Sequence, residues 1–66
     1  MPRMDIWKAA HMMIEIYDLD AGWRAGLRAD AFYEQGDMGS FLDWAMVARA
    51  IQKIQQPDQP QGDMRN

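Results

Sequence analysis

Residues 28–37 read RADAFYEQGD, and this stretch decides the fold because it holds the end of one helix and the start of the next. Phe32 and Tyr33 continue an apolar face at helical spacing. Gly36 suits the position just after a helix, where φ is positive. Asp37 can cap a following helix, since its carboxylate accepts a hydrogen bond from an unpaired N–H of the first turn. The stretch therefore predicts two helices joined by a tight turn.

The helix before this turn is predicted from Ala21 to Gln35, with Asp20 as its N-cap. Small and aromatic residues form one of its faces: Ala21, Gly22, Ala25, Gly26, Ala29, Phe32 and Tyr33. Each glycine inside a helix costs up to about 1 kcal/mol relative to alanine. We expect either close packing against another helix, which would offset this cost, or local fraying.

A first helix is predicted from Asp5 to Asp18, because apolar residues recur there at i, i+3, i+4 and i+7. Its predicted core face consists of Ile6, Trp7, Ala10, Met13, Ile14 and Tyr17. Asp5 is the expected N-cap. Asp18 is expected to end the helix in a left-handed conformation, which Asp tolerates better than most residues.

The third helix is predicted to begin at Met38 or Phe41 and to end at Gln55, before Pro57. Its core face comprises Phe41, Trp44, Val47, Ala48, Ile51 and Ile54. The polar residues 57–66 are predicted to form a disordered tail. The sequence thus predicts an all-α, compact three-helix domain over residues 1–56, with short connections.

The amino-acid composition and the net charge argue against several classes of function. The 66 residues include no cysteine and one histidine, so we expect no disulfide, no metal site and no cofactor. The net charge of −3 argues against direct binding to nucleic acid, which requires a basic surface. Charged residues interrupt every apolar run, so we expect neither a signal peptide nor a membrane span, and we expect a cytoplasmic protein.

Several short motifs follow one another in a recognisable order. They are Trp7, Asp20-Ala21, Arg28-Ala29-Asp30, Gly36-Asp37 and Trp44. In this order the chain from Ile6 to Asn66 resembles a family of short, uncharacterised alphaproteobacterial proteins. Asp18 stands where the family usually has glycine, and Gly39-Ser40 shifts the small residue after Gly-Asp by one position. The resemblance implies a three-helix fold and no particular activity.

Catalysis is not expected. The candidate acids and bases are His11, Glu15, Asp18, Asp20, Asp30 and Glu34. Acid–base catalysis uses carboxylates with shifted pKa values in a water-poor cleft, and a three-helix domain has little room for one. Capping explains the aspartates at the helix junction, and a lone histidine on a polar helix face is usually a solvated residue. We therefore predict that the protein is not an enzyme and has no small-molecule substrate.

Binding to a protein has the strongest support. Apolar and basic residues outside the predicted core faces form a candidate partner surface: Trp23, Leu27, Leu42, Met46, Arg49 and Lys53. One or two exposed apolar residues are normal, whereas for four together an interface explains the exposure as well as chance does. The expected function is that of a non-catalytic interaction module, whose partner is another protein or a second copy of the chain.

Two alternatives remain open. The first is a small acidic inhibitor, encoded by a phage or mobile element, that blocks a nucleic-acid-binding partner. It requires a clustered acidic surface, for which Glu15, Asp18, Asp30 and Glu34 are the candidates. The second is a helix-turn-helix transcription regulator, in which the third helix would present to DNA the side chains of Arg49, Gln52, Lys53, Gln55 and Gln56.

Six residues are assigned structural roles: Trp7, Asp20, Arg28, Gly36, Asp37 and Trp44. Of the six, Arg28 is the residue whose interaction partner the local sequence determines least. Asp30 falls on the other side of the same helix, so the two side chains cannot pair. We expect Arg28 to form a structural ion pair or to cap a neighbouring helix; the alternative is that it binds an anionic partner.

Overall fold

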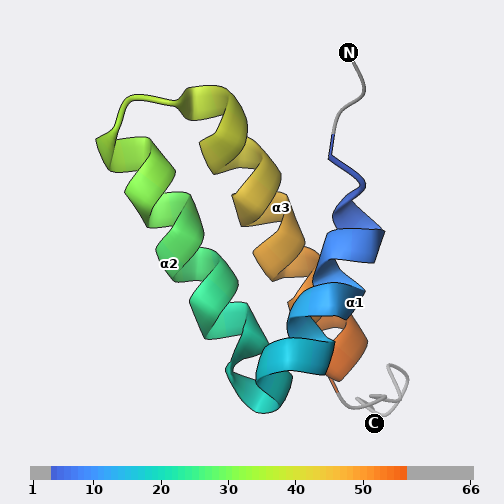
Figure 1. Ribbon diagram of the computed structural model, residues 1–66. Helices are drawn as coiled ribbons and strands as arrows, with labels where there is room; N and C mark the ends of the chain where they lie inside the picture. Colours follow the sequence, from blue (N-terminus) through green and yellow to red (C-terminus); the bar gives the residue numbers. More distant parts are fainter. Residues whose placement is uncertain (1–3, 57–66) are drawn as a thin grey trace, which may run out of the picture.

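The computed structural model describes residues 4–56, which form three α-helices and one short 3-10 turn (Figure 1). The elements are α1 (Ile6–Tyr17), η1 (Asp18–Asp20), α2 (Ala21–Glu34) and α3 (Met38–Gln55). The prediction of an all-α, three-helix architecture is confirmed, and the third helix begins at Met38. The predicted tail, residues 57–66, lies outside the described residues.

α1 begins and ends at aspartates. The Asp5 carboxylate accepts a hydrogen bond from the Lys8 N–H at 3.1 Å, as expected of an N-cap. At the other end Asp18 has a φ of 53°, so the predicted positive φ is confirmed, although its ψ of −121° lies outside the left-handed helical region. The Asp18 N–H still donates to the Ile14 carbonyl, which closes the last turn.

Asp20 lies immediately before α2, as predicted, but its side chain makes no capping hydrogen bond. The cause is its backbone conformation. With φ −86° and ψ −2°, Asp20 is part of the η1 turn, whereas a capping residue usually has extended dihedrals that direct its side chain back over the first turn. The chain thus passes from α1 into α2 through a continuous tight turn.

The turn between α2 and α3 is closed by its own backbone. Gly36, with φ 80°, donates from its N–H to Tyr33, and the Asp37 N–H donates to the Phe32 carbonyl at 2.9 Å. These two bonds form a Schellman motif, which satisfies carbonyls at the end of a helix. The Asp37 carboxylate then accepts from the Ser40 N–H at 3.1 Å and starts α3. The predicted roles of Gly36 and Asp37 agree with this geometry.

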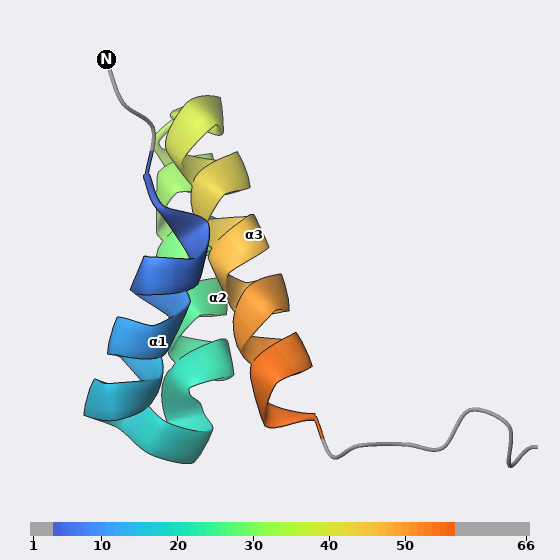
Figure 2. The same ribbon diagram turned by 90° about the vertical axis from the view of Figure 1, so that its right-hand side faces the viewer.

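α2 and α3 form an antiparallel pair, and α1 lies against the part of the pair nearest the η1 turn (Figures 1 and 2). A side-chain bond holds this end together, because Gln55 donates from Nε2 to the Asp18 carbonyl at 2.9 Å. Toward the opposite end of the pair, the Tyr33 and Phe41 rings contact each other at a centroid distance of 5.2 Å. The molecule therefore has a three-helix half and a two-helix half.

Small residues dominate the core. The contiguous buried cluster consists of Ala10, Met13, Ala21, Ala25, Val47, Ala50 and Ile51. Ala29 is also buried, and Trp44 is half-buried against the cluster. The alanines allow the helix backbones to approach closely, so the core holds few large side chains.

Three predicted core residues are exposed instead of buried. Trp7 is 54% exposed, Tyr33 is 58% exposed and Ile54, in the last turn of α3, is 37% exposed. Trp7 and Tyr33 lie at the edge of their helices' apolar faces, whose centres include the buried alanines. The structure buries Ala50 instead, a residue outside the predicted core face of α3.

The two glycines of α2 are not explained by close packing. A Cβ built on Gly22 would lie 3.7 Å from Cγ2 of Ile51, an ordinary contact, and one on Gly26 would meet nothing within 4 Å. Fraying is not observed either, since α2 is continuous across both positions. Within residues 4–56, no helix has the length and hydrophobicity that crossing a bilayer requires.

Candidate functional site

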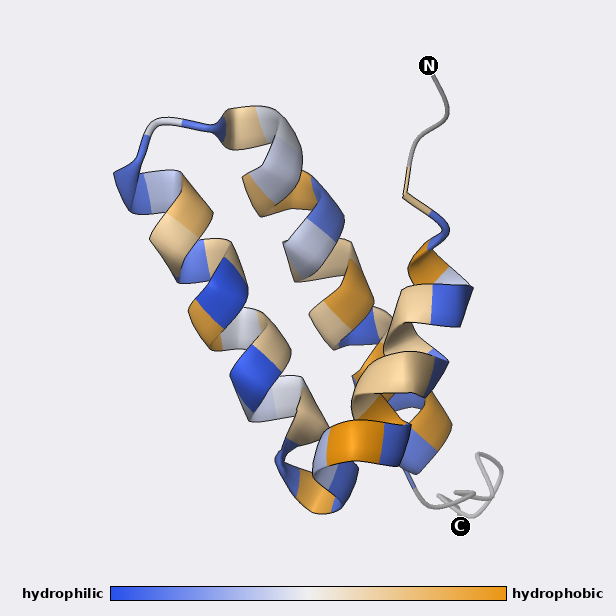
Figure 3. Cartoon of the chain, viewed as in Figure 1, coloured by the Kyte–Doolittle hydropathy of each residue, from blue (hydrophilic) through white to orange (hydrophobic). Residues whose placement is uncertain are grey.

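The six residues of the predicted partner surface are all exposed, but they lie on two different helix faces. Trp23 and Leu27 lie on α2, on the face opposite its buried alanines. Leu42, Met46, Arg49 and Lys53 lie together on the outer face of α3. Apolar residues are distributed along all three helices and are interleaved with polar ones (Figure 3).

The outer face of α2 also carries two of the predicted acidic residues. Trp23, Leu27, Asp30 and Glu34 follow the spacing i, i+4, i+7 and i+11, which places them in one row along the helix. We call this row the α2 stripe. Sequence reasoning assigned its apolar and acidic halves to separate surfaces, although their spacing already places them on one face.

The outer face of α3 has a row of the same spacing. Leu42, Met46, Arg49 and Lys53 form this row, which we call the α3 stripe. Leu42 is 56% exposed and Met46 is 54% exposed, so both present apolar surface to solvent.

A hollow of about 500 Å³ adjoins the α3 stripe. It is lined by Met4, Asp5, Ile6, Trp7, Met46, Arg49, Ala50 and Lys53. Trp7 is therefore part of this surface and not part of the core. The hollow is thus lined both by apolar side chains from the start of α1 and by the apolar and basic side chains of α3.

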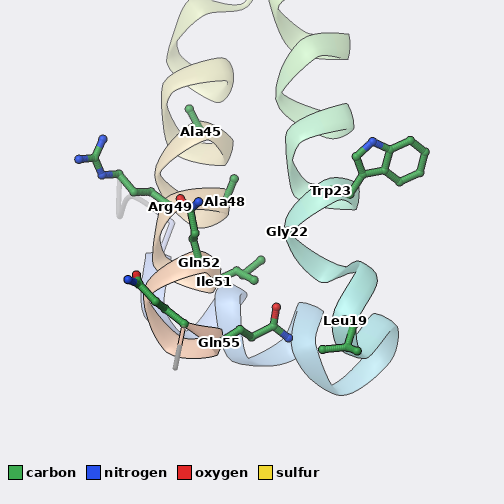
Figure 4. Close-up of a pocket in the computed structure, with 10 residues that line it drawn as sticks. Leu19, Gly22, Trp23, Ala45, Ala48, Arg49, Ile51, Gln52 and Gln55 are labelled. Carbon is green, nitrogen blue, oxygen red and sulfur yellow. The ribbon is translucent and has the colours of Figure 1, made fainter. Parts of the chain in front are cut away.

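A second hollow lies between α2 and α3 near the η1 turn and has a volume of about 780 Å³ (Figure 4). Its α3 wall includes Ala45, Ala48 and Ile51. Figure 4 shows the Trp23 indole pointing away from α3, while Arg49 extends outward from the opposite side. The two side chains border the hollow without meeting across it.

The four predicted acidic residues are exposed and fall into two pairs. Glu15 and Asp18 lie near the α1–η1 junction, whereas Asp30 and Glu34 lie toward the far end of α2. At a rise of about 1.5 Å per residue, Asp30 lies roughly 14 Å along α2 from its first residue. The pair on α2 is therefore separated from the pair near the junction by more than about 8 Å, the distance over which exposed charges interact strongly at physiological salt.

Arg28 lies against an aromatic ring. Its Cζ atom is 4.9 Å from the centre of the Trp44 ring, and Arg24 makes a similar contact with Tyr17 at 4.8 Å. Arg28 thus joins α2 to α3 through a cation–π contact. Both arginines cover half-buried aromatic side chains that the small core leaves at its edge.

The described residues include no group of three or more histidine, aspartate or glutamate side chains that could hold a metal ion. They also bury no polar or charged side chain. Comparison with known proteins finds no matching family model, no similar curated protein and no similar solved structure. The arrangement itself offers two exposed stripes and shallow hollows as surfaces for binding.

Proposed function

We propose that this protein is a non-catalytic interaction module that binds another protein through the outer face of α3. The observation that carries the proposal is the continuity of the α3 stripe with the hollow beside it. Leu42, Met46 and Trp7 are each more than half exposed, and Met46 and Trp7 line that one hollow. Arg49 and Lys53 flank the apolar surface with positive charge.

A monomer leaves single apolar side chains exposed without consequence, whereas a grouped apolar surface with polar edges is typical of an interface. Methionine and tryptophan suit such a surface, because methionine adapts its shape and tryptophan supplies a large contact area. The positive edge indicates a partner that presents carboxylates beside an apolar ridge. The absence of cysteine suits a reducing compartment, so the proposal places this binding in the cytoplasm.

The placement of the carboxylates supports a non-catalytic role. Glu15, Asp18, Asp30 and Glu34 are exposed, whereas a general acid or base works in a cleft that excludes water. The same four residues form two separated pairs, which favours the interaction module over an inhibitor that imitates nucleic acid by charge. α2 and α3 also run antiparallel (Figure 1), whereas the helices of a helix-turn-helix motif cross at about 90–120°.

The test is affinity capture from the native host with the wild-type chain and the variant Leu42→Asp/Met46→Asp as baits. Both substitutions introduce charge at exposed positions of α3, so we expect the helical circular dichroism spectrum to be retained. A protein bound by the wild-type chain should be lost from the variant, because the apolar centre of the surface is removed.

The matched control is Met12→Asp/Leu19→Asp, which introduces the same charge at two exposed apolar positions outside the α3 stripe and outside the hollow beside it. The control should capture the same protein as the wild type. Identical capture by all three baits would contradict the proposal, since the α3 stripe would then have no part in binding.

A further inference from the structure

The α2 stripe and the α3 stripe are complementary to each other. Read from the N-terminal to the C-terminal end, the α2 stripe presents two apolar residues followed by two carboxylates. The α3 stripe presents two apolar residues followed by two cations. All eight side chains are exposed, so both rows are available to a partner.

The two stripes also match in length. Each spans twelve residues with the same internal spacing, and the eleven steps from its first to its last residue correspond to about 16 Å along an α-helix. If the two helices lie parallel, apolar residues meet apolar residues and carboxylates meet cations along the whole row. Leu27 would lie against Met46, while Asp30 and Glu34 would lie beside Arg49 and Lys53.

The two stripes cannot pair within one chain. α2 and α3 are antiparallel (Figure 1), and both stripes face away from the core that the helices share. A helix that presents the complementary row in the parallel direction must therefore belong to a different molecule, and α2 of a second copy carries that row.

We propose that the α3 stripe of one copy binds the α2 stripe of a second copy, with the two helices parallel. This inference rests on the proposed function and names the partner as the chain itself. The hollow beside Met46 and Trp7 receives Leu27 of the second copy. The Asp5 carboxylate, at the edge of this hollow, already accepts a hydrogen bond from the Lys8 N–H. The charged ends set the direction of pairing, because the antiparallel arrangement would place carboxylates on apolar side chains.

The contact is head-to-tail. Each copy that uses its α3 stripe leaves its α2 stripe free, so a third copy can add at the free end. One pair of stripes buries less surface than a standard stable interface, so association should appear at high protein concentration. It should also weaken as salt is added, because the ion pairs at its edge are exposed.

Sedimentation velocity of the full chain over a range of concentrations tests this proposal with two charge-reversal variants. Asp30→Lys/Glu34→Lys makes both stripes basic, and Arg49→Glu/Lys53→Glu makes both acidic. We expect each variant alone to associate about tenfold more weakly than the wild type or not at all. An equimolar mixture should associate again, because each variant supplies the stripe that the other lacks.

The control Glu15→Lys/Asp20→Lys changes the net charge by the same amount as Asp30→Lys/Glu34→Lys, but outside both stripes. It should associate as the wild type does, and circular dichroism should show the same helicity for all variants. A wild-type chain that stays monomeric at the highest concentration, or a mixture that stays monomeric, overturns the inference. If Leu42→Asp/Met46→Asp nevertheless loses a host protein, the proposed function stands and the second copy is not its partner.

Discussion

At the scale of single residues, Arg28 contacts an aromatic ring, a partner that its charge alone does not suggest. Local sequence excludes Asp30 as its partner, and charge then favours another carboxylate. The structure places Arg28 over Trp44. The small core leaves this ring half-buried, and a guanidinium covers its exposed face while its own polar edge stays in water.

Gly36 and Gly26 differ in backbone conformation, so replacing each by alanine should change the free energy of unfolding in opposite directions. Gly36→Ala should lower the free energy of unfolding by about 1 kcal/mol, because φ 80° is strained for a residue with a Cβ. Gly26→Ala should raise it by up to about 1 kcal/mol, because the site is helical and open within 4 Å. Urea unfolding followed by circular dichroism measures both changes. A gain in stability for Gly36→Ala would contradict the assigned turn.

At the scale of elements, the ends of the helices are determined mostly by local sequence. Asp5 and Asp37 cap α1 and α3 through hydrogen bonds to N–H groups three residues ahead. Asp20 occupies the same kind of position in sequence and makes no such bond. The difference arises because η1 precedes α2 without a break, so the backbone at Asp20 is already helical.

This contrast gives a matched pair of substitutions. Asp37→Ala should lower the free energy of unfolding by about 1 kcal/mol, since it leaves the Ser40 N–H without its capping acceptor. Asp20→Ala should change it much less, since no capping bond is lost. Thermal and urea unfolding of the two variants side by side provide the measurement, and equal losses would show that α2 is capped by Asp20 in solution.

At the scale of the whole molecule, the three-helix half is built around alanines, and a long-range hydrogen bond joins its ends. Gln55 lies 37 residues from Asp18, and its side chain joins the end of α3 to the end of α1. The two-helix half depends on the Schellman turn and on the contact between Tyr33 and Phe41. The end near η1 therefore carries most of the tertiary packing.

Gln55→Ala should lower the free energy of unfolding by about 1 kcal/mol relative to Gln52→Ala. Both substitutions exchange glutamine for alanine in α3, so the difference isolates the bond to the Asp18 carbonyl. Amide hydrogen exchange should in addition show faster exchange near the α1–η1 junction in Gln55→Ala. Equal stability of the two variants would show that this bond contributes nothing measurable.

Sequence by itself determined the number of helices and most of their boundaries. Capping aspartates, a glycine with positive φ and apolar spacing act through neighbours within a turn or two, so they can be identified along the chain. The same spacing places Trp23 with Asp30 on one face of α2, and Leu42 with Lys53 on one face of α3.

Tertiary structure alone decided which apolar residues are buried. Helical spacing identifies the apolar face of a helix. When that face includes both alanine and tryptophan, the spacing does not show which of the two is buried against the neighbouring helix. Ala50 is buried against the core cluster, whereas Trp7 lies exposed beside Met46 at the edge of the contact. The hollow beside the α3 stripe, and the position of Arg28 over Trp44, follow from that packing.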